Sequence, residues 1–106
     1  MGERTAGVID GNLGETLRKL TAVIAARREV PEEESYTARL LANKGDILYK
    51  KLVEEACELA LAAKDADHDH IRYEAADLLY HLLVLLEREA VTTAELAGEL
   101  DARAAR

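Results

Sequence analysis

The sequence is poor in the residues that interrupt or cross-link a fold. Its 106 residues include one proline, one cysteine and no phenylalanine or tryptophan. One cysteine, Cys57, excludes an internal disulfide and fits a reducing compartment. No apolar run reaches the roughly 18 residues that a spanning helix needs, and the start MGERTAGVIDG lacks the apolar core of a signal peptide. We therefore expect a cytoplasmic protein without a membrane partner.

Positive charge is also scarce. The chain has 14 Lys and Arg against 21 Asp and Glu, a formal net charge of −7. General affinity for a nucleic acid backbone needs clustered cations, so we expect no nucleic acid partner. An acidic protein can still bind a polyphosphate through divalent cations, provided that some of its carboxylates gather at one place.

Helix-forming residues dominate what remains. Ala, Leu and Glu are abundant, and the apolar residues recur at helical spacing. The sequence therefore predicts an all-α fold: one domain over residues 1–106, a bundle of about five helices, with residues 1–11 and 102–106 flexible. The predicted helices cover residues 13–28, 36–44, 47–64, 70–89 and 93–101, with Pro31 after the first and a DADHD turn before the fourth. The predicted caps are Asn12, Ser35, Asp46 and Thr92, with Glu15 and Glu95 as capping-box partners.

The predicted third helix has an acidic side. On a helical wheel the residues Glu54, Glu55 and Glu58 share one arc with Lys51. The opposite arc is apolar and contains Leu48, Leu52, Ala56, Leu59, Ala60 and Ala63. A solvated face with weak Lys50–Glu54 and Lys51–Glu55 pairs explains the acidic arc as well as a binding site does. Both interpretations stay open for this helix alone.

The predicted fourth helix favours a site. Glu74 and Asp77, at i and i+3, share a face one turn before the apolar run from Leu78 to Leu86. A short turn packs consecutive helices antiparallel, which can bring this pair opposite Glu55 and Glu58. Four converging carboxylates suit Mg²⁺ or Mn²⁺. The alternative is that acidic residues simply favour the start of a helix.

These residues resemble a known family. ExxE at Glu55 and Glu58, followed by ExxD at Glu74 and Asp77, is similar to the all-α nucleoside triphosphate pyrophosphohydrolases of the MazG type. Within that superfamily, the segments SYTARLL (35–41), Lys51 before EEACE, and YEAADLLYHLLVLL (73–86) resemble the phosphoribosyl-ATP pyrophosphatases of histidine biosynthesis. The chain departs from the family pattern at Val53, where glycine is common, and in the segment NKGDILY.

The resemblance implies a reaction and roles for its residues. It implies hydrolysis of phosphoribosyl-ATP to phosphoribosyl-AMP and pyrophosphate with Mg²⁺, for which Mn²⁺ substitutes. Glu55, Glu58, Glu74 and Asp77 would hold the metal. Glu54 would orient the attacking water, and Lys51 would contact a phosphate. Ser35, Tyr36 and Arg39 would contact the substrate or a partner subunit.

The remaining aromatic residues suggest structural roles. We expect His81 to be a hydrogen-bonded buried residue, Tyr73 and Tyr80 to be core or interface residues, and His68 and His70 to lie in a solvated turn. The apolar run from Leu78 to Leu86 exceeds what one small chain can cover, which predicts a partner helix. The resemblance implies a homodimer or a dimer of dimers.

Two alternative functions remain. One is a general nucleotide house-cleaning enzyme of the same superfamily, which the metal motif does not exclude. The other is a non-catalytic helical dimerisation module whose acidic residues are only solvated.

Overall fold

A computed structural model describes residues 5–42 and 45–105 of the chain, and every regular element in these ranges is helical. The five α-helices are α1 (Leu13–Ala26), α2 (Tyr36–Ala42), α3 (Ile47–Lys64), α4 (His68–Arg88) and α5 (Thr93–Ala104). Two short 3₁₀ turns, Arg27–Glu29 and Glu32–Glu34, connect α1 to α2. The all-α prediction with five helices is confirmed. None of the described helices is both long and apolar enough to cross a membrane.

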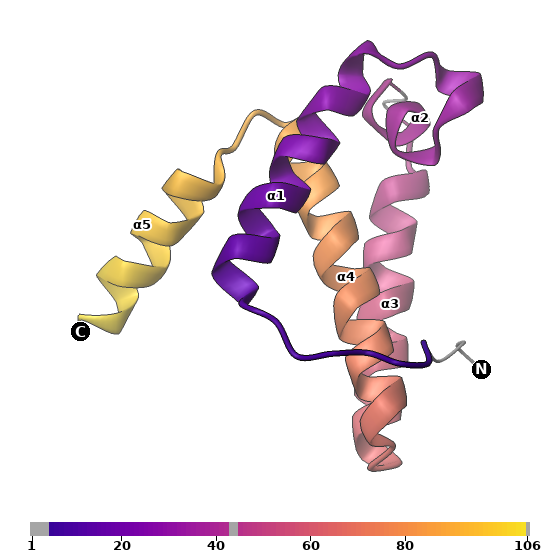
Figure 1. Cartoon of the computed structure of the whole chain (residues 1–106), viewed down its shortest axis with the longest axis vertical. Coiled ribbons are helices and arrows are strands. Elements are labelled where there is room, and N and C mark those ends of the chain that lie inside the picture. Colours follow the sequence, from indigo (N-terminus) through magenta and orange to yellow (C-terminus); the bar gives the residue numbers. More distant parts are fainter. Residues whose placement is uncertain (1–4, 43–44, 106) are drawn as a thin grey trace.

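An antiparallel hairpin of α3 and α4 forms the centre of the molecule, and these two helices share the most extensive contact (Figure 1). The turn between them places Ala66 in the left-handed region, at a φ of 53°. The helix α1 lies along α4, and α2 packs near the end of the hairpin that is remote from this turn. The last helix, α5, extends away from the others.

Local capping explains most helix starts. The side chains of Asn12 and Thr92 accept hydrogen bonds of 3.0 Å from the backbone N–H of Glu15 and Glu95. Ser35 does the same for Ala38 at 3.1 Å. These three predicted caps are confirmed. The fourth is only partly right: Asp46 occupies the cap position of α3, but its backbone is helical and its side chain makes no capping bond.

Some helix ends differ from the predicted ones. The first predicted helix tightens into a 3₁₀ turn at Arg27. The fourth begins at His68, two residues earlier than predicted, because Asp67 caps it by accepting from the His70 N–H at 3.2 Å. His68 and His70 therefore both lie in a helix, and the predicted turn is wrong for both, although His68 is exposed to solvent. The predicted end of the second helix at Lys44 lies outside the described residues, as do residues 1–4 and 106 of the two ends that were predicted to be flexible.

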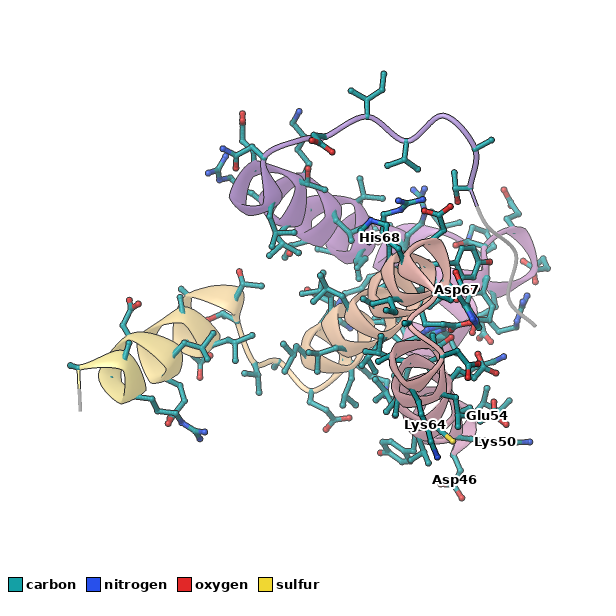
Figure 2. All side chains as sticks on the ribbon, turned by 90° about the horizontal axis from the view of Figure 1, so that it is seen from below. Asp46, Lys50, Glu54, Lys64, Asp67 and His68 are labelled. Atoms are coloured by element: carbon teal, nitrogen blue, oxygen red, sulfur yellow. The ribbon has the colours of Figure 1, made fainter. Side chains whose placement is uncertain are left out.

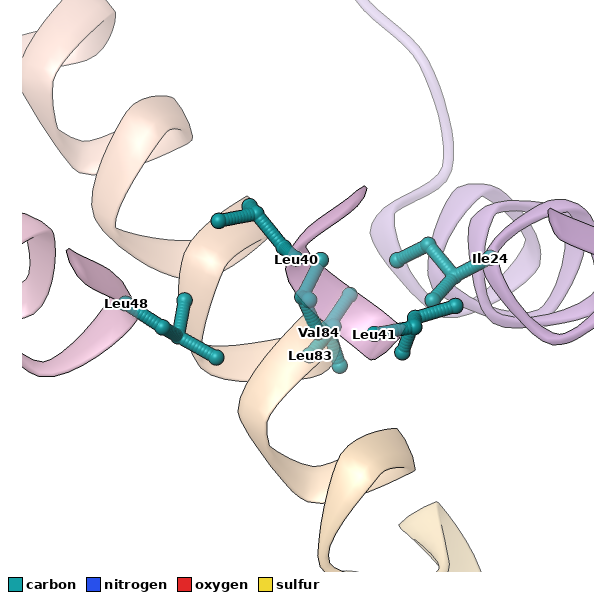
Figure 3. Packing of buried hydrophobic residues seen from close by; sticks show 6 residues of the cluster. All are labelled: Ile24, Leu40, Leu41, Leu48, Leu83 and Val84. Carbon is teal, nitrogen blue, oxygen red and sulfur yellow. The ribbon is translucent and has the colours of Figure 1, made fainter. Parts of the chain in front are cut away.

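The core forms where α1, α2, α3 and α4 meet. Ile24, Leu40, Leu41, Leu48, Leu83 and Val84 are buried and form one cluster (Figure 3). Every apolar residue from Leu78 to Leu86 is buried or partly buried within the single chain. The helices α1, α2 and α3 cover much of this run, and the part of it that is only partly buried leaves the expected contact with a partner helix a prediction.

The helix α3 also carries exposed apolar residues. Its side toward α4 buries Leu48, Glu55 and Ala62, which are seven residues apart and so share a face. The predicted apolar arc is rotated relative to this seam, and part of it is exposed. Three alanines of the arc are exposed and lie beside two further exposed apolar residues. We call this set the outer stripe of α3: Tyr49, Val53, Ala56, Ala60 and Ala63.

Candidate active site

The two predicted carboxylate pairs meet at one hollow beside the α3–α4 hairpin. Its volume is about 240 Å³. The helix α3 contributes Lys51, Glu54, Glu55 and Glu58, and α4 contributes Tyr73, Glu74 and Asp77. The predicted convergence of the four carboxylates is thus present in the fold. Sequence reasoning assigned Tyr73 to the core or an interface and missed its place in this wall.

Helix geometry explains the gathering. On α3 the contributing residues are three, four and seven positions apart, which puts them on one side of the helix. On α4 the pair Glu74 and Asp77 is three positions apart. Because the two helices run antiparallel, the middle of α3 faces the first half of α4, and the pairs come together.

Two of the carboxylates are buried. Glu55 is 8% exposed and Glu74 is 1% exposed, and one oxygen of each, Oε1, is fully buried and accepts no hydrogen bond. Burial raises the pKa of Glu55, and the neighbouring charges of His81 and Lys51 oppose that shift. Burial also raises the pKa of Glu74, and the adjacent Glu58 adds to the increase. Charged forms of both groups are therefore costly without a nearby cation.

Each buried carboxylate has a histidine beside it on α4. Nε2 of His70 lies 3.1 Å from Oε2 of Glu74. Nδ1 of His81 lies 2.6 Å from Oε1 of Glu55 and 3.1 Å from the backbone oxygen of Asp77. His81 is 5% exposed, so its predicted role as a buried, hydrogen-bonded residue is confirmed. The spacing could have indicated the first pair, since His70 is four residues before Glu74, but the contact of His81 with Glu55 depends on how α3 packs against α4.

The carboxylates fit a hard divalent cation chemically, although they are not arranged as a finished coordination site. Among the described residues, no three Asp, Glu, His or Cys side chains have a ready-made metal-holding geometry. Like charges spread apart unless a cation draws them together. Oε1 of Glu74, which is buried and has no donor, is an atom that such a cation would satisfy, and an oxygen-rich set suits Mg²⁺ or Mn²⁺.

Lys51 and Glu54 lie at the open side of the hollow. Lys51 is partly buried, and its charge favours the ionised form of Glu55. Glu54 is exposed, and its Oε2 lies 4.0 Å from Nζ of Lys50, so this predicted pair is present. Figure 2 shows Lys50 and Glu54 together on the outside of α3. An ion pair as exposed as this is weak, so it does not hold the Glu54 side chain away from the hollow.

The three predicted residues of the SYT segment lie on or beside α2. Ser35 caps the helix. The guanidinium of Arg39 lies 5.7 Å from the centre of the Tyr36 ring, and its Nη1 donates to the carbonyl of Glu32 at 3.4 Å. Tyr36 reaches toward the hollow, with its hydroxyl 2.9 Å from Nε2 of His81. Their contact with substrate or a partner subunit stays a prediction.

Comparison with known proteins identifies the family. The profile of the family "Phosphoribosyl-ATP pyrophosphohydrolase" matches residues 17–104, a span that includes every residue of the hollow. The chain belongs to this family.

Individual relatives agree with this family assignment. The chain is 45% identical over 92 residues to a phosphoribosyl-ATP pyrophosphatase of Rhizobium rhizogenes, an alignment that covers 87% of the chain and 88% of that protein. It is 45% identical over 94 residues to a protein of the same name from Halobacterium salinarum strain R1, covering 86% and 99%. It also matches a histidine biosynthesis bifunctional protein of Shewanella oneidensis, 42% identical over 90% of the chain and 45% of that longer protein.

Proposed function

We propose that the protein hydrolyses phosphoribosyl-ATP to phosphoribosyl-AMP and pyrophosphate, in the histidine pathway and in the cytoplasm. Family membership supports the substrate. The observation that carries the chemistry is the hollow, which gathers five carboxylates and one lysine of this acidic chain in about 240 Å³. A merely solvated face does not bury Glu55 and Glu74.

Glu55, Glu58, Glu74 and Asp77 would hold Mg²⁺, and Mn²⁺ would substitute for it. The bound cation would offset the negative charge that develops on the leaving pyrophosphate. The burial of Glu55 and Glu74 supports this assignment, because a cation removes the cost of keeping both groups ionised. The hairpin holds these side chains on two rigid helices, so the phosphate chain binds in one orientation.

Lys51 and Glu54 are suited to the substrate side of the site. Lys51 would contact a phosphate oxygen as a point charge. Glu54, exposed and only weakly paired with Lys50, would orient the water and take a proton from it as the water oxygen attacks. The anhydride bond between the α and β phosphates would break, and pyrophosphate would leave.

The deciding experiment measures pyrophosphate release from phosphoribosyl-ATP and from ordinary nucleoside triphosphates, each with Mg²⁺ and with excess EDTA. We expect Mg²⁺-dependent turnover that is confined to phosphoribosyl-ATP. Turnover of the ordinary triphosphates would move the protein to the house-cleaning class. Inactivity on every substrate would favour the non-catalytic dimerisation module.

The role of the carboxylates is tested with Asp77→Asn. This change keeps the shape of the side chain but removes a charge that the cation would bind, so we expect kcat/KM to fall by roughly 100-fold. Asp69→Asn is the matched control, because Asp69 is exposed on the same helix and pairs with Arg72, whose Nη1 lies 3.2 Å from Oδ1 of Asp69. Equal turnover and equal Mg²⁺ dependence in the two variants would exclude Asp77 from the site.

We further propose a homodimer, or a dimer of dimers, that meets through the outer stripe of α3. The stripe is apolar, exposed, and on the side of α3 away from the carboxylates. The chain exposes 7539 Å², whereas a monomeric protein of 11.7 kDa exposes about 5,900 Å². The excess exceeds the roughly 800 Å² per chain that a standard subunit contact covers.

A further inference from the structure

A chain of three side chains leads from α2 into the carboxylate hollow. The hydroxyl of Tyr36 lies 2.9 Å from Nε2 of His81, and Nδ1 of the same ring lies 2.6 Å from Oε1 of Glu55. The three residues come from α2, α4 and α3. The chain therefore joins three helices and ends on a residue of the hollow.

The hydrogen-bond partners of the His81 ring show which of its nitrogens carries the hydrogen. Nδ1 of His81 lies 3.1 Å from the backbone oxygen of Asp77, which can only accept a hydrogen bond. Nδ1 therefore carries the hydrogen. In the neutral ring Nε2 is then an acceptor, and the Tyr36 hydroxyl donates to it. The N–H of Nδ1 faces two acceptors, the Asp77 carbonyl and the Glu55 carboxylate.

The surroundings hold this ring in place. His81 is 5% exposed, and the Tyr36 and Tyr80 rings pack edge-on against it, with centroid distances of 5.8 and 4.8 Å. The hydroxyl of Tyr80 bonds to Oγ1 of Thr37 and so ties α4 to α2 a second time. The imidazole cannot turn away from Glu55 without breaking these contacts.

Glu55 needs such a partner. Its Oε1 is fully buried and accepts no hydrogen bond with good geometry, so the histidine at 2.6 Å is what faces that oxygen. A partner that fixes one carboxylate oxygen determines where the other oxygen points. Groups that hold a metal ligand in this way typically contribute roughly 10- to 100-fold to metal affinity.

We propose that His81, held by Tyr36 and by the Asp77 carbonyl, is a positioning residue that aims the Glu55 carboxylate at the cation. This inference rests on the proposed function, in which Glu55 binds the metal. His81 touches neither the cation nor the substrate in this arrangement. Its effect on the reaction passes through Glu55.

The test compares Mn²⁺ affinity, measured by electron paramagnetic resonance, in variants of the full-length chain. His81→Gln keeps a polar group near Tyr36 but loses the donor near Glu55, whereas His81→Asn keeps a donor at the position of Nδ1. We expect Gln to weaken Mn²⁺ binding by roughly 10- to 100-fold and Asn to restore part of the loss. The melting temperature in EDTA, measured alongside, reports any loss of folding.

Tyrosine variants provide a matched pair. Tyr36→Phe removes the hydroxyl that holds His81, and we expect a several-fold loss of Mn²⁺ affinity. Tyr80→Phe removes the other hydroxyl that bonds α4 to α2, but it leaves both ring nitrogens of His81 untouched. We expect unchanged Mn²⁺ affinity for it. Equal losses in the two variants would mean that general α2–α4 packing, not the positioning of Glu55, sets the affinity.

Each outcome decides between the proposals. If the native protein binds no Mn²⁺, the metal site of the proposed function fails. If it binds Mn²⁺ and the folded His81 variants bind equally well, only the positioning role is overturned. If the His81 variants do not fold, Tyr36→Phe decides, and native affinity in that variant would refute the role.

Discussion

At the scale of single residues, the least expected feature is the burial of glutamate. Glu74 is 1% exposed, its Oε1 has no hydrogen-bond donor, and its pKa is raised by burial and by Glu58. Stable proteins rarely keep a carboxylate in such a place without a compensating charge. We therefore expect the buried carboxylate to lower the stability of the metal-free chain and to raise the affinity of the site for a cation.

The cost of burying this charge predicts the stability of the Glu74→Gln variant. The amide keeps the shape but needs no cation, so in EDTA the variant should be more stable than the native chain by about 1 kcal/mol, which raises Tm by about 5 °C. Mg²⁺ should raise the Tm of the native protein but not that of the variant. Thermal melts with and without Mg²⁺ measure both effects. Glu33→Gln, at an exposed position, should change neither. A variant that is less stable in EDTA would show that protein donors, not a cation, compensate Glu74.

Residue-scale prediction from the sequence succeeded where spacing alone decides. The four carboxylates were predicted to converge because each pair occupies one face of a helix. The burial of Glu55 was not predicted, because it depends on which side of α3 meets α4. His70 was missed because Asp67 starts the helix earlier than the polar DADHD segment suggested.

At the scale of elements, helix starts were the most predictable feature. Asn12, Ser35 and Thr92 cap their helices through contacts within three residues, which the sequence displays directly. Asp46 shows the limit of that reasoning, since its backbone is helical and its side chain makes no cap. The placement of α2 and of α5 depends on contacts between helices and could not be predicted locally.

The helix α5 depends on its own cap more than the others do. It extends away from the core (Figures 1 and 2), and Thr92 and Glu95 form a reciprocal capping box, with bonds of 3.0 Å in both directions. Thr92→Ala should therefore cost α5 about 1 kcal/mol and speed amide exchange in its first turn roughly fivefold. Exchange in α3 and α4 should not change. Thr93→Ala is the control. Faster exchange throughout the chain would mean that α5 unfolds together with the core.

At the scale of the whole molecule, the single chain is more open than its size requires. Its radius of gyration is 15.0 Å, whereas a compact domain of 106 residues has about 13 Å. The extended α5 contributes to this openness, and the outer stripe of α3 is a separate surface that the single chain leaves uncovered. The sequence led us to expect an uncovered apolar surface on α4. The fold covers much of that surface with α1, α2 and α3, and it leaves a further apolar stripe uncovered on the neighbouring helix α3.

A charge in the outer stripe should therefore separate the proposed dimer. Ala60→Glu keeps a good helix former on α3 but places a carboxylate in the middle of the stripe, where a partner would bury it without a counter-charge. We expect sedimentation at micromolar concentration to show a dimer or a larger assembly for the native chain and a monomer for the variant. Ala94→Glu, a matched change at an exposed position of α5, should leave the assembly intact.

Mn²⁺ binding and pyrophosphate release, measured in the Ala60→Glu variant, show whether the reaction requires the assembly. Ala60 lies on the opposite side of α3 from Glu55 and Glu58, so a monomeric variant should keep the Mn²⁺ affinity of the hairpin. If that variant binds Mn²⁺ but releases no pyrophosphate, a residue of the partner subunit completes the substrate site. If it remains fully active as a monomer, one chain contains the whole site. A native chain that sediments as a monomer would refute the dimer, because its uncovered stripe would then be stable in water.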